Sequence, residues 1–161
     1  MLNSILRKPF KLLSLFVCCL LLFSFKTTPD AQQMLTWSNA MLSRVYDSSA
    51  EVKLKKWELT VTDGYFLRLR KTFQNGKQEY FSCQLGSFND LDYIGTTASG
   101  IIRVNTKADN VIVQTYNDRK GDIDSMATSF NIPVKNIESE QIDSLRNALL
   151  YFKNAPAVTI R

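Results

Sequence analysis

Two groups of aspartates have the spacing that could support metal binding or hydrolysis. Asp118, Asp122 and Asp124 lie close together, and Asp90 lies two residues before Asp92. Neighbouring carboxylates can supply oxygen ligands to calcium or a carboxylate pair to a glycosidic bond. The first group lacks the full spacing of a calcium loop and its bidentate Glu, and Asp is a common turn residue. We therefore expect both groups to be solvated turns, with a metal site in the first group and an Asp-based hydrolase as the alternatives.

Other catalytic chemistry is restricted by the complete absence of histidine. This excludes Ser-His-Asp and Cys-His nucleophilic sites and most zinc sites. No Gly-x-Ser-x-Gly, Walker or dinucleotide-binding glycine pattern occurs. Cys83 is expected beside Leu67 on a buried face, where a cysteine is a small core residue rather than a reactive thiol. We predict a non-enzymatic protein with no cofactor.

A third group of residues points to binding. In the expected strand register, Arg68 lies between Glu58 and Ser82 on the solvent face of a sheet, and Arg70 lies between Lys56 and Tyr80. Arg, Tyr and Phe are enriched in protein interfaces. We predict a binding surface here, the alternative being an ordinary hydrated sheet face whose ion pairs contribute little. Its members are Glu58, Phe66, Arg68, Arg70, Tyr80 and Ser82.

These residues depend on a meander of three strands between Val52 and Leu85. Turns at residues 62–64 and 74–76 each contain a Gly, which can take positive φ where the chain reverses. Loops of three residues place the apolar side chains on one face and the polar side chains on the other. This register pairs Val61 with Tyr65, Leu59 with Leu67, Trp57 with Leu69, Leu69 with Phe81, Leu67 with Cys83, and Lys71 with Glu79.

The segments before and directly after this meander are a helix and a loop. Residues 31–46 carry apolar residues at helical intervals, namely Met34, Trp37, Met41 and Val45, and predict an amphipathic helix that buries this stripe. Residues 86–100 are rich in Asn, Asp, Thr and Ser, which indicates a surface loop.

The remaining chain is expected to add strands and a closing helix. Strands at 101–106 and 111–117 would form a hairpin that pairs Val104 with Val113. Residues 121–134 fit a strand better than a helix, because Pro133 would end a helix and suits an edge strand. The last helix is expected to be capped by Ser139 and to bury Ile142, Leu145, Leu149 and Phe152.

Together these elements predict an α+β fold. We expect an antiparallel β-meander of about six strands, with an N-terminal and a C-terminal helix packed on its apolar face. No internal repeat or low-complexity linker suggests a second domain, so residues 32–156 are predicted to be a single domain and residues 157–161 a tail.

The N-terminal residues 1–31 have the pattern of an export signal. Arg7, Lys8 and Lys11 precede an uncharged apolar run at residues 12–25, which is short for a transmembrane span. We predict a signal peptide cleaved near Ala31 and a periplasmic or secreted protein. The alternative is a membrane anchor formed by residues 12–25.

Charge and composition narrow the partners. Four of the 20 Lys and Arg residues and one of the 15 Asp and Glu residues precede Gln32, so the rest of the chain has a net charge of +2. This gives no argument for nucleic-acid binding. We predict a small exported binding or accessory module that meets a protein or cell-envelope component. The alternative is a carrier of an apolar small molecule or lipid held between the sheet and the helices.

Overall fold

The structure, a computed structural model, describes residues 30–155. The predicted signal or anchor and the predicted tail lie outside this range, apart from Asp30 and Ala31, at the start of the first helix. None of the helices between residues 30 and 155 is both long enough and apolar enough to cross a membrane.

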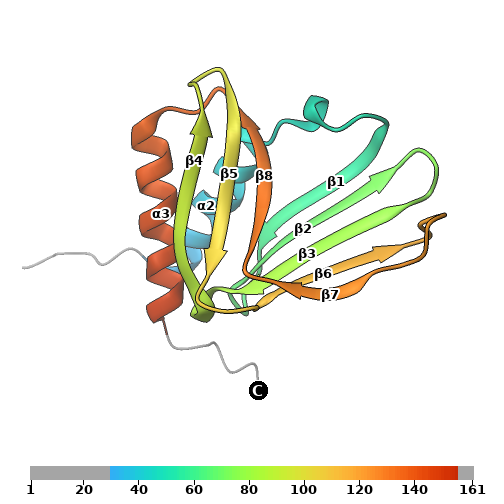
Figure 1. Ribbon diagram of the computed structural model, residues 1–161. Helices are drawn as coiled ribbons and strands as arrows, with labels where there is room; N and C mark the ends of the chain where they lie inside the picture. Colours follow the sequence, from blue (N-terminus) through green and yellow to red (C-terminus); the bar gives the residue numbers. More distant parts are fainter. Residues whose placement is uncertain (1–29, 156–161) are drawn as a thin grey trace, which may run out of the picture. The chain divides into compact units, whose positions relative to one another are not determined.

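The described elements alternate between strands and short connections, with one helix at each end (Figure 1). In chain order they are α2 (Ala31–Val45), the 3₁₀ helix η1 (Ser48–Ala50), β1 (Leu54–Val61), β2 (Phe66–Phe73), β3 (Gln78–Gln84), the 3₁₀ helix η2 (Leu85–Ser87), β4 (Phe88–Gly95), β5 (Ser99–Thr106), β6 (Val111–Tyr116), β7 (Asp124–Ala127), β8 (Ser129–Lys135) and α3 (Ser139–Asn154).

The eight strands form two antiparallel sheets. The five-stranded sheet has the order β1-β2-β3-β6-β7, and the three-stranded sheet has the order β4-β5-β8. The chain changes sheet three times, between β3 and β4, between β5 and β6, and between β7 and β8. The predicted α+β class with antiparallel strands and a helix at each end is therefore confirmed, although the strands are divided between two sheets.

Both helices lie on one side of the three-stranded sheet (Figure 1), and α2 also packs against β1. One continuous core joins α2, α3 and the inner faces of both sheets; Leu42, Leu59, Ile102 and Phe152 are among its fully buried residues. Along β2 and the later parts of β1 and β5, buried positions alternate with exposed or half-buried ones, because one face of each strand meets the core and the other meets solvent.

The two helices begin and face the core nearly as predicted. In α2 the buried positions include Leu35 and Leu42, whereas Trp37 is 40% exposed, so its place in the predicted buried stripe was wrong. In α3 the predicted buried residues are all buried, but the N-cap is Glu138 rather than Ser139. The side chain of Gln141 accepts a hydrogen bond from the Glu138 amide at 3.0 Å, which closes the first turn.

Side chains of the two helices also form hydrogen bonds with the backbone of two edge strands, β1 and β4. Asn39 of α2 donates from Nδ2 to the Val61 carbonyl at 3.0 Å, and its Oδ1 accepts from the Val61 amide at 2.6 Å. Arg146 of α3 donates from Nη2 to the carbonyl of Leu91 on β4 at 2.8 Å. Side chains therefore take up hydrogen-bonding groups that an edge strand would otherwise present to another chain.

The first hairpin differs from the prediction by two residues. Leu59 pairs with Leu69 rather than Leu67, and the turn has four residues that end in Tyr65 with φ of 57°. A shift of two residues keeps every side chain on its predicted face. In the second hairpin the predicted pairs, Lys71 with Glu79 among them, are confirmed.

Residues 86–100 are mostly strand, so the predicted surface loop was wrong. Phe88–Gly95 forms β4, and Ser99 begins β5. The polar residues of β4 lie on a solvent face of the three-stranded sheet, and a register shift between Phe88 and Asp90 interrupts the alternation. Because one face of β4 meets solvent and is polar, the composition of this segment resembled that of a loop.

The predicted hairpin between residues 101–106 and 111–117 was also wrong. Val104 pairs with Leu91 and Phe130, whereas Val113 lies in the other sheet. Between the two strands the chain turns a corner, where the Thr106 hydroxyl donates to the Ala108 carbonyl at 2.7 Å. Both strands contribute apolar side chains to one core. A similar pattern of apolar side chains therefore did not show which strands pair.

The choice of strand over helix for residues 121–134 is confirmed. This segment supplies two strands, β7 and β8, that belong to different sheets. Pro133 lies in β8 at the edge of the three-stranded sheet, as predicted, and its carbonyl accepts from the Asp47 amide at 2.9 Å.

Candidate functional site

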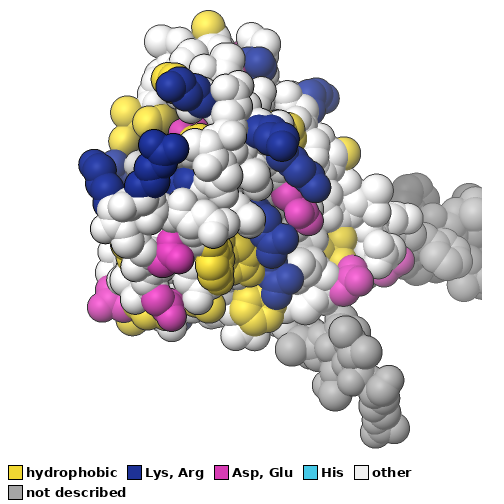
Figure 2. All heavy atoms as spheres, turned by 90° about the vertical axis from the view of Figure 1, so that its right-hand side faces the viewer, with side chains coloured by type: hydrophobic (Ala, Val, Ile, Leu, Met, Phe, Trp, Pro, Cys, Tyr) yellow, Lys and Arg dark blue, Asp and Glu magenta, His cyan; other side chains and the backbone are white. Residues whose placement is uncertain are grey.

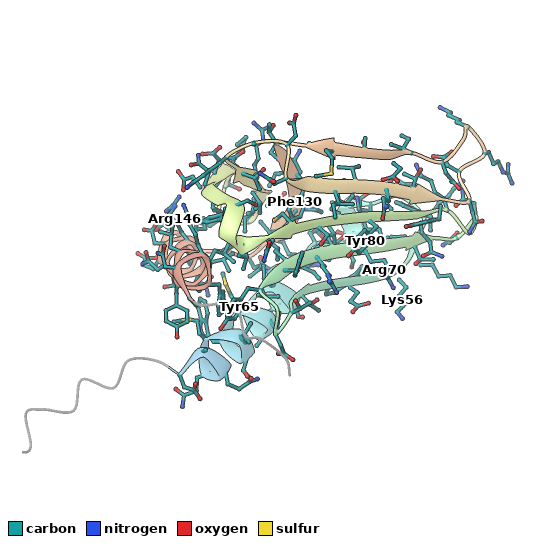
Figure 3. All side chains as sticks on the ribbon, turned by 90° about the horizontal axis from the view of Figure 1, so that it is seen from below. Lys56, Tyr65, Arg70, Tyr80, Phe130 and Arg146 are labelled. Atoms are coloured by element: carbon teal, nitrogen blue, oxygen red, sulfur yellow. The ribbon has the colours of Figure 1, made fainter. Side chains whose placement is uncertain are left out.

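The six residues of the predicted binding surface lie on the outer face of β1, β2 and β3, which we call the outer face. Arg68 pairs with Thr60 and Ser82, and Arg70 pairs with Glu58 and Tyr80. The structure thus brings the predicted residues together, with Glu58 opposite Arg70 rather than Arg68. Figure 3 shows Lys56, Arg70 and Tyr80 near one another across the three strands. Ser82 is only 2% exposed, so it supports this face without offering contact area.

The two arginines of the outer face lie over aromatic rings and form no ion pair with the carboxylates of residues 30–155. The guanidinium carbon of Arg68 is 5.1 Å from the ring centre of Phe66, and that of Arg70 is 5.5 Å from Tyr80. Both side chains are exposed. Within residues 30–155 neither makes an ion pair, even though Glu58 lies opposite Arg70. The guanidinium groups are therefore oriented by the rings and keep their donors available.

The outer face has shallow relief. A hollow of about 90 Å³ lies between Glu58, Arg68 and Tyr80, and one of about 190 Å³ lies beside Lys56 and Trp57. Arg70 borders both hollows. These volumes are smaller than those of typical small-molecule pockets, which favours contact with an extended or flat partner.

The aspartates of the β6–β7 connection bond to nearby groups. Asp118 accepts from Lys77 Nζ at 2.8 Å, and Asp122 accepts from the Asp118 amide at 2.9 Å. Asp124 accepts from Gln114 Nε2 at 3.1 Å. Among the described residues, no group of three or more acidic or cysteine side chains is arranged to hold a metal ion.

The second acidic pair, Asp90 and Asp92, lies on the solvent face of β4. Both of its carboxylates also have partners within the fold. Asp90 Oδ1 lies 3.1 Å from Nε of Arg146, and Asp92 accepts from Nδ2 of Asn105 at 2.8 Å. These contacts tie β4 to α3 and to β5. Both carboxylates have structural partners, as solvated positions at a sheet surface commonly do.

A chain of ion pairs on the inner face of the five-stranded sheet was not predicted. Lys71 is 7% exposed, and its Nζ lies 2.7 Å from Glu51 and 3.1 Å from Glu79. Lys77 continues the chain at 3.0 Å from Glu79 and 2.8 Å from Asp118. A lysine at an inward position opposite Glu79 was a signal that the sequence did contain.

These ion pairs change the protonation of their members. Burial acts to raise the pKa of Glu79, but hydrogen bonds from Lys77 and Lys71 lower it overall. The pKa of Lys77 is raised, chiefly by its hydrogen bonds to Asp118 and Glu79. Both effects favour the charged forms.

Two core residues, Tyr46 and Cys83, carry titratable side chains that take no part in the ion pairs. The hydroxyl of Tyr46 is buried without a hydrogen-bond partner among the described residues, and its pKa is raised by burial and by Glu51, Glu79 and Asp47. Burial also raises the pKa of Cys83 to about 12, so the thiol stays protonated at neutral pH.

A larger hollow, of about 520 Å³ and open to solvent, lies between η1 and the solvent face of the three-stranded sheet; we call it the η1 hollow. It is not the space between helices and sheets that the predicted carrier would use, where Leu42 and Phe152 are each 1% exposed. Its walls come from distant segments, so the sequence did not reveal it. They include Asp47, Glu51, Lys71, Ile94, Ile101 and Pro133.

Comparison with known proteins adds no functional assignment. No protein-family model matches the chain, and no curated protein or solved structure is significantly similar to it.

Proposed function

We propose that this chain is a small exported, non-enzymatic binding module, and that its outer face holds an acidic protein or cell-envelope component. The observation that carries the proposal is the pair Arg68 and Arg70. Both guanidinium groups are exposed, lie over aromatic rings and lack carboxylate partners among the described residues. Such groups bind carboxylates or phosphates at little cost in side-chain ordering.

The surroundings of the two arginines favour an anionic partner. Lys56 adds a third positive charge to the outer face, against the one negative charge of Glu58. Figure 2, which views the molecule from the right-hand side of Figure 1, shows Lys and Arg side chains from top to bottom through the middle of that side, with Asp and Glu side chains among and around them. An excess of positive charge speeds the approach of an acidic partner and makes its binding sensitive to salt.

Export forms part of this proposal and rests on the sequence. The basic residues before residue 12 and the apolar run at 12–25 have the order of an export signal. A single buried cysteine in the described part, Cys83, is compatible with an oxidising compartment, because it cannot form a disulfide within the fold.

The test compares two double variants of equal charge. Arg68→Gln with Arg70→Gln removes the proposed contacts, whereas Lys107→Gln with Arg119→Gln removes two exposed charges elsewhere. Immobilised protein is incubated with an envelope extract of its host, and retained components are quantified by mass spectrometry. We expect wild type and control to retain a common acidic component that the first variant loses, and that ~0.5 M salt releases. Equal retention by both double variants would refute the proposal.

A further inference from the structure

The η1 hollow has the size of a small-molecule site. Its volume of about 520 Å³ falls within the range of ~300–1,000 Å³ that is common for ligand pockets. It lies on the inner side of β2, where Lys71 points, and so it is separate from Arg70 and the outer face. The two walls of the hollow differ in character.

The first wall is apolar. Ile94 pairs with Ile101, and Ile101 pairs with Pro133, so three apolar side chains form a row across β4, β5 and β8. Ile94 is 53% exposed and Ile101 is 38% exposed, although they stand next to each other on a sheet. Adjacent exposed aliphatic side chains gain stability when another apolar group covers them.

The second wall is acidic. Glu51 uses Oε1 to accept from Lys71 at 2.7 Å, and Asp47 uses Oδ1 to accept from Ser49 at 3.0 Å. The other oxygens, Oε2 of Glu51 and Oδ2 of Asp47, accept no hydrogen bond from the described residues. Each carboxylate can therefore bind a further donor.

The charges around this wall do not balance. Lys71 is shared between Glu51 and Glu79, and Asp47 has Lys135 at 3.4 Å. Glu79 and Asp118 also share Lys77, so this set of ion pairs has four carboxylates and three lysines, an excess of one negative charge. Lys71 is also held by the ring of Phe81, 5.3 Å away, which leaves it little freedom to turn toward a ligand. A ligand with a positive charge would complete this arrangement, whereas an anion would be repelled.

We propose that the η1 hollow binds an aliphatic ammonium group, with the charged head at Glu51 and Asp47 and the hydrocarbon part on Ile94 and Ile101. Free alkylamines and the lysine side chains of peptides share this chemistry. The site is independent of the proposed function, because it uses neither arginine of the outer face.

The test uses three probes with the same hydrocarbon part, namely hexylammonium, hexanoate and hexanol. Each is titrated into the ¹⁵N-labelled full chain at neutral pH and followed by NMR. We expect hexylammonium to bind at least ~10-fold more tightly than the other two. The shifted amides should surround Ile101 and Glu51. Equal binding of the three probes, shifts confined to other surfaces, or no saturable binding of hexylammonium would each overturn the proposal.

Variants separate the two walls. Glu51→Gln with Asp47→Asn keeps an acceptor for Lys71 and should abolish the preference for hexylammonium, while Glu58→Gln, an acid on the outer face, should leave it unchanged. Ile101→Ser changes an exposed residue and should weaken all three probes. If the preference survives Glu51→Gln with Asp47→Asn in a variant that is folded by circular dichroism, the acidic wall is not the binding group and the proposal fails.

A final arm identifies the source of the ammonium group. A short acetylated and amidated peptide with one central Lys is compared with hexylammonium under the same conditions. Tighter binding of the peptide supports the site and assigns the ammonium group to a protein partner, whereas tighter binding of hexylammonium supports the site and assigns it to a free amine.

Discussion

Replacing Asn39 tests whether its side chain stabilises β1, the edge strand of the five-stranded sheet. Its side chain makes two hydrogen bonds to the backbone of Val61, at 2.6 Å and 3.0 Å, and Val61 is 3% exposed. In Asn39→Ala both backbone groups lose their partner. Each bond contributes ~1 kcal/mol net, so the loss is ~2 kcal/mol. Ala is a better helix former than Asn by ~0.5 kcal/mol, which leaves a destabilisation of ~1.5 kcal/mol.

The assay is equilibrium unfolding in urea together with hydrogen exchange of the Val61 amide. We expect a lower urea midpoint, a fall in melting temperature of ~5 °C for a domain of this size, and faster exchange at Val61. Ser43→Ala, at an exposed position of the same helix, measures the helix-propensity gain alone. A cost below ~0.5 kcal/mol for Asn39→Ala, with unchanged protection of Val61, would refute the reasoning.

Three further predictions address burial, backbone conformation and charge. Cys83, whose pKa burial raises to about 12, should resist thiol reagents in the native protein at pH 8 and react on unfolding in urea; rapid native labelling would contradict its burial. Gly95→Ala should cost ~1–3 kcal/mol in urea unfolding, because φ is +151° and a Cβ would overlap the backbone of the facing strand. Gly86→Ala has open space and should change stability by less than ~0.5 kcal/mol, so similar costs would argue against this explanation. The stabilisation from Glu79, whose pKa is lowered, is fully present above its unfolded value of ~4.3 and is lost as pH falls through the folded value. The stabilisation from Lys77, whose pKa is raised, is fully present below the unfolded pKa of ~10.4 and is lost as pH rises through the folded pKa. Stability should therefore decline on both sides of this window, and Lys77→Met should flatten both declines in urea titrations at varied pH.

Local patterns predicted much of the fold. The alternation in β2 identified the core side of Leu67 and Leu69, and the turn at Gly76, with φ of 87°, fixed the second hairpin. In the first hairpin the turn ends in Tyr65, a non-glycine residue with positive φ, which composition does not announce. The predicted register of this hairpin was wrong by two residues, and each side chain still lies on its predicted face of the sheet.

Sheet membership could not be predicted in this way. Val104 and Val113 have the same character because their strands contribute to one core, and only long-range contacts assign them to different sheets. The same limit applies to the sites. The outer face lies within one meander and was visible in the sequence, whereas the η1 hollow joins Glu51, Ile101 and Pro133 from separate segments.

The three changes of sheet have a consequence for how this chain acquires its structure. β6 takes its place beside β3 only after β4 and β5 have been made, and β5 gains its second neighbour only when β8 emerges. Contacts of such sequence separation slow folding, because the entropy of closing the loops is lost before the contacts form. Neither sheet can be completed from one half of the chain. We therefore expect both to melt in a single cooperative transition, and a chain cut within residues 107–110 to yield two fragments that are unfolded apart.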